Sequence, residues 1–387
     1  MSILYITNIL SDEAGGGEYL FWLYSKYMAM RGHRVHVIAR IIEKAPHEGV
    51  VALETGPDIT QRGVQHQGIL GNLAYIKRGL EKVKAMYRDI DIIHSNTYMP
   101  AIIGGLSKVL YRKPHVITIH DIAAVMGVRF IYKWFREGGS SGLGAYAKAL
   151  VSIAYEHILA KHIPRDLILA PSHQTKRDVE VLGGNGVEVV PNFIDTEYYN
   201  KLKSLYGVDY EPCILYIGRL VFYKNILYML KLFKNLKDIK LVIIGGGPEY
   251  NMLRKLIPDN MKGNIEVLGN ISQERKALYL SKCAATINLS YFEGFGLTIL
   301  ESWLFEKPVI AASIPPFTEI VENNIDGLLV DIRDKNGVLK AVETLARNRG
   351  YARKLGLNGY RKLAERYTPD IITSMLESVY ARVIKGI

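Results

Sequence analysis

The chain has 387 residues, which is too long for one ordinary hydrophobic core and predicts two domains. Hydrophobic residues make up 49% and charged residues 22%, a balance that excludes a disordered chain, a collagen-like repeat and a disulfide-stapled miniprotein. The 49 Lys and Arg against 38 Asp and Glu give a formal net charge of +11. This excess indicates an anionic partner, which could be nucleic acid, anionic lipid or a phosphorylated small molecule.

The sequence carries no sign of export. The two cysteines, Cys213 and Cys283, are too few for a disulfide framework, and the first residues lack the basic and apolar regions of a signal peptide. No apolar run is long enough for a spanning helix. We therefore expect a cytoplasmic protein, with a peripheral position on the inner face of the membrane as the alternative.

Apolar strands alternate with helical periodicity along the first half of the chain. A strand is expected over residues 3–6, followed by a Gly-rich loop at 15–17 and a helix over 19–31. Further strands are expected over residues 35–39, 90–94, 114–120 and 166–170. Because these strands are continuously apolar, both faces of the sheet should be covered, which is typical of a doubly wound parallel α/β domain.

The same pattern restarts near residue 210. Strands are expected over residues 213–217, 240–244, 265–268, 285–289 and 308–311, with helices over 225–234, 248–256 and 273–281 between them. The polar stretch 191–210 is interpreted as an irregular interdomain linker. The fold class is thus α/β, with two Rossmann-like parallel-sheet domains.

One segment departs from this rhythm. Residues 101–150 contain seven Lys or Arg and two Asp or Glu. On a helix over 129–136, the cations Arg129, Lys133 and Arg136 share one face, next to Phe130 and Trp134. Aromatic rings beside cations suit a membrane interface or an anionic acceptor. The alternative is a solvated basic helix that packs its aromatic side chains on the core.

Two cations follow the first strand of the second half. Gly218-Arg219 and Lys224-Asn225 come directly after the strand 213–217, at the sheet edge where α/β proteins bind ligands. Such a pair suits a diphosphate, and a structural ion pair is the alternative. Further on, Glu293 lies on a loop and Glu301 on the helix that follows it. A carboxylate can accept two hydrogen bonds from a diol, which suits ribose or hexose recognition.

These residues carry a resemblance to a known family. The second half resembles the retaining glycosyltransferases of family 4, which have the GT-B fold, through Gly218-Arg219 with Lys224-Asn225, Gly245-Gly-Gly-Pro248, Glu293-Gly-Phe-Gly296 through Glu301, and Asn324-Ile-Asp-Gly327. The first half matches more weakly, through Gly15-Gly-Gly-Glu18 and Thr118-Ile-His120-Asp121. The resemblance implies two Rossmann-like domains that face each other across a cleft. These are an acceptor-binding domain over residues 1–195, with a terminal helix in 366–387 packing back on it, and a donor-binding domain over 196–365.

The resemblance also implies a function. It implies transfer of a hexose-type sugar, with retention at the anomeric carbon, from a nucleotide-sugar such as a UDP- or GDP-hexose to a glycan or polyprenyl-linked acceptor. No cofactor, metal or nucleic acid is expected. The departing phosphate acts as the base, so no enzyme nucleophile is needed. Arg219 and Lys224 would stabilise the leaving diphosphate, and Glu293 and His120 would contact the sugar. The expected donor-binding residues are Gly16, Gly17, Asn270, Gly296, Leu297, Thr298 and Glu301.

Two departures from the family pattern matter for the site. Asn192-Phe193 stands where the family has Asn-Gly, and Phe222-Tyr223 replaces a commonly acidic residue before Lys224, which could change how that lysine is positioned. Other functions stay open at this point. One is an inactive scaffold that binds anionic lipid or nucleic acid, and another is a sugar phosphorylase or nucleotide-sugar epimerase of the same fold.

Overall fold

The computed structural model describes residues 1–56, 69–234, 236, 238–261 and 263–386. The chain divides into two compact units. Unit 1 comprises Met1–Val125, Val151–Asn192 and Pro369–Ile387, and unit 2 comprises Met126–Leu150 and Phe193–Thr368. Residues 126–150 therefore group with unit 2, whereas the sequence analysis assigns them to the first domain.

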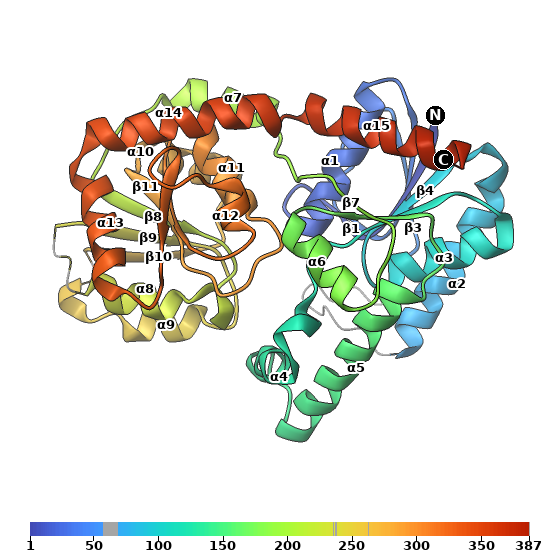
Figure 1. Ribbon diagram of the computed structural model, residues 1–387, viewed down its shortest axis with the longest axis horizontal. Helices are drawn as coiled ribbons and strands as arrows, with labels where there is room; N and C mark the ends of the chain where they lie inside the picture. The colour runs from blue at the N-terminus through green and yellow to red at the C-terminus, as the bar shows by residue number, and fades with distance from the viewer. Residues whose placement is uncertain (57–68, 235, 237, 262, 387) are drawn as a thin grey trace. The chain divides into compact units, whose positions relative to one another are not determined.

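Unit 1 (Figure 1) is built on a parallel sheet. Its seven described strands run in the order β3-β2-β1-β4-β5-β6-β7. Strand β1 lies between β2 and β4, with Ile3 beside Val35 on one side and Ile92 on the other. The strands are β1 (Ser2–Leu10), β2 (Arg34–Ile42), β3 (Val50–Glu54), β4 (Ile92–Ser95), β5 (His115–Thr118), β6 (Leu167–Ala170) and β7 (Val187–Val189).

The helices of unit 1 cover both faces of this sheet, as the continuously apolar strands predict. They are α1 (Gly16–Met30), α2 (Ile69–Met86), α3 (Met99–Tyr111), α6 (His173–Val181) and α15 (Pro369–Lys385), with α5 (Gly142–Lys161) shared by the two units. In the part of the chain that the structure describes, no helix has the length and hydrophobicity that crossing a bilayer requires.

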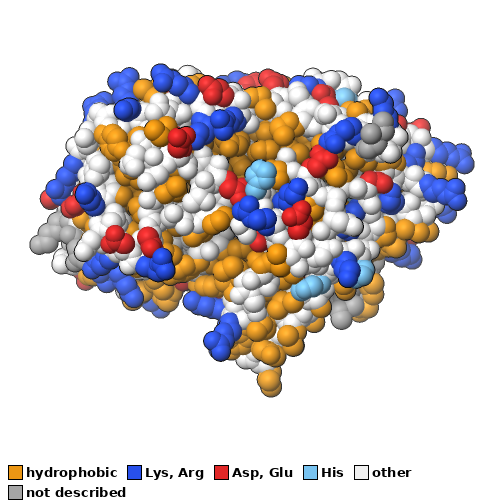
Figure 2. All heavy atoms as spheres, in the orientation of Figure 1, with side chains coloured by type: hydrophobic (Ala, Val, Ile, Leu, Met, Phe, Trp, Pro, Cys, Tyr) orange, Lys and Arg blue, Asp and Glu red, His pale blue; other side chains and the backbone are white. Residues whose placement is uncertain are grey.

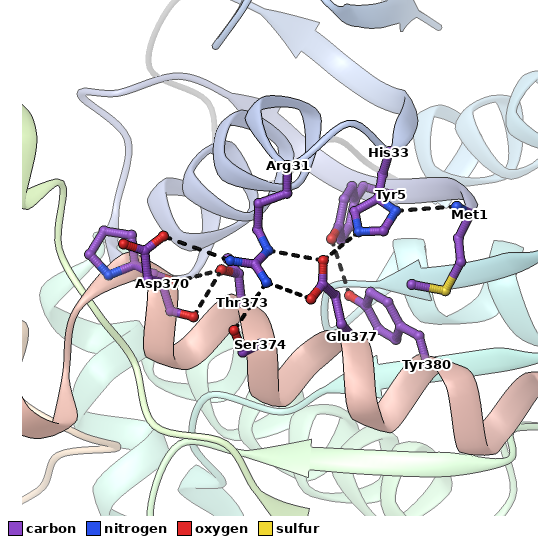
Figure 3. Close-up of polar contacts among 10 residues, drawn as sticks. Met1, Tyr5, Arg31, His33, Asp370, Thr373, Ser374, Glu377 and Tyr380 are labelled. Atoms are coloured by element: carbon purple, nitrogen blue, oxygen red, sulfur yellow. Dashed lines mark hydrogen bonds and ion pairs between the residues drawn. The ribbon is translucent and has the colours of Figure 1, made fainter.

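The C-terminal helix α15 docks on unit 1, as the terminal helix of the resembled family does (Figure 3). Arg31, just after α1, donates two hydrogen bonds to Glu377 at 2.9 and 2.6 Å, and His33 contacts the same carboxylate at 2.6 Å. Below this surface the hydroxyl of Tyr380 lies 2.6 Å from Nδ1 of His94 on β4. Ion pairs at the rim and a buried hydrogen bond thus fix α15 to β4 and α1.

Unit 2 repeats the architecture with six described parallel strands in the order β10-β9-β8-β11-β12-β13. Its strands are β8 (Cys213–Ile217), β9 (Lys240–Ile244), β10 (Ile265–Gly269), β11 (Ala285–Asn288), β12 (Val309–Ala312) and β13 (Gly327–Val330). Its helices are α4 (Val128–Glu137), α7 (Thr196–Tyr206), α8 (Ile226–Phe233), α9 (Tyr250–Leu256), α10 (Gln273–Lys282), α11 (Leu297–Leu304), α12 (Phe317–Ile320), α13 (Lys335–Arg347) and α14 (Arg349–Arg366). The prediction of two Rossmann-like domains is confirmed.

The predicted linker 191–210 is wrong in one respect, because helix α7 occupies its middle. Asp195 caps the helix by accepting a hydrogen bond from the backbone N–H of Tyr198 at 3.0 Å. Tyr199 and Leu202, three positions apart, form its buried face against α10. The polar composition of the stretch hides this short apolar stripe.

Candidate functional site

In unit 2, the point where the strand order reverses lies between β8 and β11. From β8 the chain runs to β9 and β10 on one side, and then returns to β11 on the other. The loops that leave β8 and β11 therefore diverge at the carboxyl edge of the sheet, which is where open α/β sheets bind ligands. The predicted cations follow β8, and the loop with Glu293 follows β11.

Glycines allow the loops on this edge to approach one another closely. Gly218 and Gly245 directly follow β8 and β9, Gly269 is the last residue of β10, and the N–H of Gly245 donates to the carbonyl of Gly269 at 2.9 Å. A Cβ on Gly245, whose φ is +136°, would lie 2.0 Å from the carbonyl oxygen of Gly218. The loops thus pack backbone against backbone, which a side chain at position 245 would prevent.

The two cations are held in different ways. The guanidinium of Arg219 donates to the hydroxyl of Tyr223 at 2.7 Å. The ammonium of Lys224 forms an ion pair with the carboxylate of Glu293, and both side chains are largely buried. The structure therefore brings Lys224 together with Glu293, so the ion pair kept as the alternative is observed for Lys224, with a partner that the sequence does not identify.

Polar groups at the end of β11 fix the Glu293 carboxylate. The hydroxyl of Ser290 donates to its Oε1 at 2.8 Å, and the side-chain amide of Asn288 at 3.3 Å. A second contact ties the two loops together, because the N–H of Tyr291 donates to the carbonyl of Tyr223 at 2.8 Å. The acid and the cations are thus part of one hydrogen-bonded edge.

Glu301 lies on α11 and is buried in a network of its own. Lys276 of α10 donates to its Oε1 at 2.7 Å, and the hydroxyl of Tyr199 of α7 lies 2.8 Å from the same oxygen. Lys276 also donates to Tyr199 at 2.8 Å. The Glu301 carboxylate is therefore held by the ammonium of Lys276 and the phenol of Tyr199, which come from two helices distant in sequence.

The other predicted donor-binding residues of unit 2 lie at loop and helix ends. Leu297 and Thr298 begin α11 after Gly296, whose φ is +109°. The first N–H groups of a helix have no partner within it, so these positions can bind an anion or a hydroxyl. Asn270 follows β10 and lies against Gly246, where a Cβ would come within 3.0 Å of the Asn270 amide.

Helix α4 carries the predicted membrane or acceptor residues, and its aromatic side chains pack within unit 2. The ring centroids of Phe130 and Phe292 are 5.5 Å apart, and those of Trp134 and Tyr223 are 5.4 Å apart. The Arg219 guanidinium lies 5.8 Å from the centroid of the Trp134 ring. Of the two interpretations of this segment, the packed helix is the one observed for the aromatic rings.

The polar side of α4 also contacts the loop after β8. The carboxylate of Glu137 accepts a hydrogen bond from the N–H of Phe222 at 3.2 Å, and the ammonium of Lys133 lies 4.3 Å from the Phe222 ring centroid. Arg129, Lys133 and Arg136 are exposed, as expected. The Phe222-Tyr223 pair, noted as a departure from the family pattern, is thus the surface on which α4 docks.

In unit 1 the predicted residues gather around the start of α1. Gly16 and Gly17 are its first residues, and a Cβ on Gly17 would lie 2.7 Å from the ring of His120. Burial lowers the pKa of His120 to about 4, so its ring is neutral near pH 7. No hydrogen-bond partner for either ring nitrogen lies among the described residues. His120 is therefore available to a substrate hydroxyl.

The residues that support these groups are not among the predicted site residues. Asn288 and Ser290 could have been found, since polar side chains at the carboxyl end of a buried strand are a known signal of a site. Lys276 and Tyr199 give no such signal, because each is an ordinary residue of its own helix and meets Glu301 only through the fold.

Two family models match this chain, one on each half. The model described as Glycosyltransferase Family 4 matches residues 14–198, and the model described as Glycosyl transferases group 1 matches residues 203–362. An uncharacterised glycosyltransferase of Methanocaldococcus jannaschii is 24% identical over 373 residues, which cover 91% of this chain and 90% of that protein.

Two solved structures with similar folds cover nearly the whole chain. Sucrose-phosphate synthase of Thermosynechococcus elongatus superposes with a TM-score of 0.79 at 18% identity, over 100% of both chains. HepE of Anabaena, in complex with UDP and glucose, has a TM-score of 0.74 at 19% identity, over 98% of this chain and 99% of that chain. At 18% and 19% identity, these two superpositions show a shared fold and nothing more.

Proposed function

We propose that this chain, which belongs to the family 4, group 1 glycosyltransferases, moves a hexose-type sugar from a nucleotide-diphosphate sugar to a glycan or polyprenyl-linked acceptor. The observation that carries the proposal is the convergence of Arg219, Lys224 and Glu293 on the carboxyl edge of the unit 2 sheet. A sheet edge with two cations and a fixed carboxylate suits a ligand that joins a diphosphate to a polyhydroxyl ring.

Arg219 and Lys224 are the proposed catalytic cations. Cleavage of the glycosidic bond leaves a second negative charge on the terminal phosphate of the nucleoside diphosphate, and cations that are already oriented stabilise that charge without reorganising. Arg219 is oriented by Tyr223 and Lys224 by Glu293. Because neighbouring residues hold both side chains in place, we interpret the two cations as a preorganised site and not as mobile surface charges.

The two carboxylates receive different parts of the donor. Glu293, next to Lys224, is proposed to bind hydroxyls of the transferred sugar. Glu301, with the first N–H groups of α11 at Leu297 and Thr298, is proposed to bind the ribose. Because a carboxylate has about four lone-pair sites, Glu301 can hold Lys276 and Tyr199 and still accept from a diol.

Unit 1 contributes a helix start and a neutral imidazole. We assign the N–H groups of Gly16 and Gly17 to an anionic oxygen of the substrate, since the N-terminus of α1 has a positive dipole end. His120 is proposed to hydrogen-bond a sugar hydroxyl. Its lowered pKa supports this role, because a neutral ring can both donate and accept.

We further propose that transfer occurs with retention at the anomeric carbon and needs no metal ion. In this scheme the acceptor hydroxyl attacks the face from which the diphosphate leaves. The departing phosphate oxygen takes the proton of that hydroxyl. Arg219 and Lys224 supply the positive charge at the leaving group. HepE, which binds UDP and glucose, makes UDP-glucose the first donor to test.

The acceptor is proposed to be presented at the inner face of the membrane. The surplus of cations in residues 101–150, seven against two acids, supports an anionic surface or a lipid phosphate rather than nucleic acid. The protein itself is then cytoplasmic and peripheral to the membrane.

A screen of UDP-, GDP- and ADP-sugars tests the proposal through release of the nucleoside diphosphate. We expect one donor class to be turned over, with the same rate in EDTA, and the product to keep the anomeric configuration of the donor. Loss of activity in EDTA would contradict the metal-independent scheme, and an inverted product would contradict retention. Release of free sugar phosphate without nucleotide would indicate a phosphorylase instead.

A further inference from the structure

Helix α5 has an apolar side that faces solvent. Leu143 is 89% exposed and Val151 is 68% exposed, and three further large side chains on the helix are about half exposed. Residues spaced by three, four and seven positions lie on one helix face. The exposed stripe, which we call the α5 stripe, consists of Leu143, Tyr146, Ala147, Leu150, Val151, Ala154 and Ile158.

The opposite side of α5 is also apolar. Ala145, Ala149, Leu159 and Ala160 are buried against the protein. A helix with large apolar side chains on two opposite sides normally has both sides covered. Helix α13 shows the usual arrangement, with Val338 and Leu345 buried and Lys335, Lys340 and Arg347 in solvent. The residues that the structure describes leave the α5 stripe without such a cover.

The charges beside the stripe are positive. Residues 128–161 contain five Lys or Arg and two Glu, and all five cations are exposed. Both acids are engaged elsewhere. The carboxylate of Glu137 accepts from the N–H of Phe222, and the carboxylate of Glu156 is buried and accepts from the N–H of Ala124 at 2.6 Å. Figure 2 shows orange hydrophobic side chains at the tip formed by α4 and α5, with Lys and Arg in blue beside them.

We infer that the α5 stripe inserts into the surface of a bilayer rich in anionic lipid, with the cations of α4 and α5 on the lipid phosphates. The inference rests on the membrane-facing acceptor of the proposed function and assigns the surface that meets the lipid. A second copy of this chain is the less suitable cover, because it would bring another net charge of +11 to a basic face. Leu and Tyr with flanking Lys and Arg are the composition of an interfacial helix.

Helix α4 alone does not provide the apolar part of this membrane contact. Phe130 and Trp134 are occupied by Tyr223 and Phe292. In α4 only the cations are left to face lipid, and the apolar part of the contact comes from Leu143, Tyr146 and Leu150 of α5.

Vesicle sedimentation with the full chain tests the inference. Wild-type protein should sediment with vesicles of phosphatidylcholine that contain about a quarter phosphatidylglycerol, and much less with pure phosphatidylcholine. The double variant L143S/L150S should bind the anionic vesicles at least about tenfold more weakly, since two apolar side chains no longer enter the interface. The control L205S changes another exposed leucine, which is 74% exposed on α7, and should bind like wild type.

Three results would overturn the inference. They are unchanged binding by L143S/L150S, equal or absent binding of wild type to the two vesicle types, and a wild-type dimer in solution that the double substitution dissociates. Nucleotide release without vesicles separates this inference from the proposed function. If no donor is turned over while the double substitution still abolishes vesicle binding, the function fails and the surface assignment stands.

Discussion

At the scale of single residues, the side chains that hold the proposed ligand-binding groups in place determine the geometry of the site. Glu301 and Glu293 can be predicted from the sequence, because their spacing and their place after a strand are local features. Their partners cannot, because Lys276 is 25 positions from Glu301 and Tyr199 is 102 positions away. We therefore propose Lys276 as a positioning residue for Glu301, one that only the fold reveals.

We predict that Lys276→Met raises the donor KM about tenfold and leaves kcat within about threefold. The substitution leaves the buried Glu301 carboxylate without its cation, which weakens its hold on the ribose. The proposed ribose contact would be the same in the ground state and the transition state, so its loss should appear in KM. Steady-state kinetics with the best donor from the screen measures both parameters.

A rescue and a matched ion pair separate positioning from general destabilisation. Lys276→Arg should restore most of the donor affinity. Lys203→Met breaks the pair between Lys203 and Glu306, whose atoms are 2.8 Å apart, beyond the C-terminal end of α11. That variant should lower the melting temperature without changing KM. An equal rise in KM for Lys203→Met would show that Lys276 acts only on stability.

At the scale of elements, α4 shows where a local pattern is ambiguous. Its helical periodicity and its cation face are correctly predicted from the sequence. The sequence leaves open what the aromatic face meets, because a ring beside a cation suits either lipid or protein. The contacts of Phe130 and Trp134 with Tyr223 and Phe292 decide this, and they join residues about 90 to 160 positions apart.

Three buried histidines, His94 on β4, His115 on β5 and His120 just after β5, should make unit 1 acid-sensitive. Burial lowers the pKa of His115 and His120 to about 4 and that of His94 well below 6.5. Between pH 6.5 and 4 the unfolded chain takes up protons that the folded chain does not, so stability falls as the pH falls. The buried carboxyl of Glu156, whose pKa is raised to about 7, acts in the opposite direction.

A difference measurement isolates one histidine from these opposing groups. Between pH 6.5 and 4, each buried histidine lowers the free energy of unfolding by about 1.4 kcal/mol for every unit that the pH falls. The His115→Gln variant lacks one of these histidines. The difference in free energy of unfolding between wild type and this variant should therefore decrease by about 1.4 kcal/mol for each pH unit as the pH is lowered from 6.5 to 4. Urea unfolding at several pH values measures it. A pH-independent difference would contradict the account.

At the scale of the whole chain, the two sheets can be predicted from the sequence, but the exact division of the chain into two units cannot. Continuously apolar strands with short glycine-rich loops predict parallel sheets covered on both faces, and both sheets have that form. The grouping of residues 126–150 with unit 2 depends on side-chain packing far from them in sequence, which no local pattern contains. Arg219 and Lys224 of the predicted diphosphate site and the basic face beside the α5 stripe account for only part of the net charge of +11.

In the proposed function the Lys224 and Glu293 pair holds the donor, and the kcat/KM of Lys224→Ala measures that role. Removing a preoriented cation at the leaving group should lower kcat/KM by about a hundredfold to a thousandfold. Lys240→Ala is the control, because Lys240 pairs with Glu266 at 2.7 Å at the start of β9, on the opposite edge of the same sheet. The account predicts a near wild-type rate for that control. Equal rates for Lys224→Ala and Lys240→Ala would contradict it.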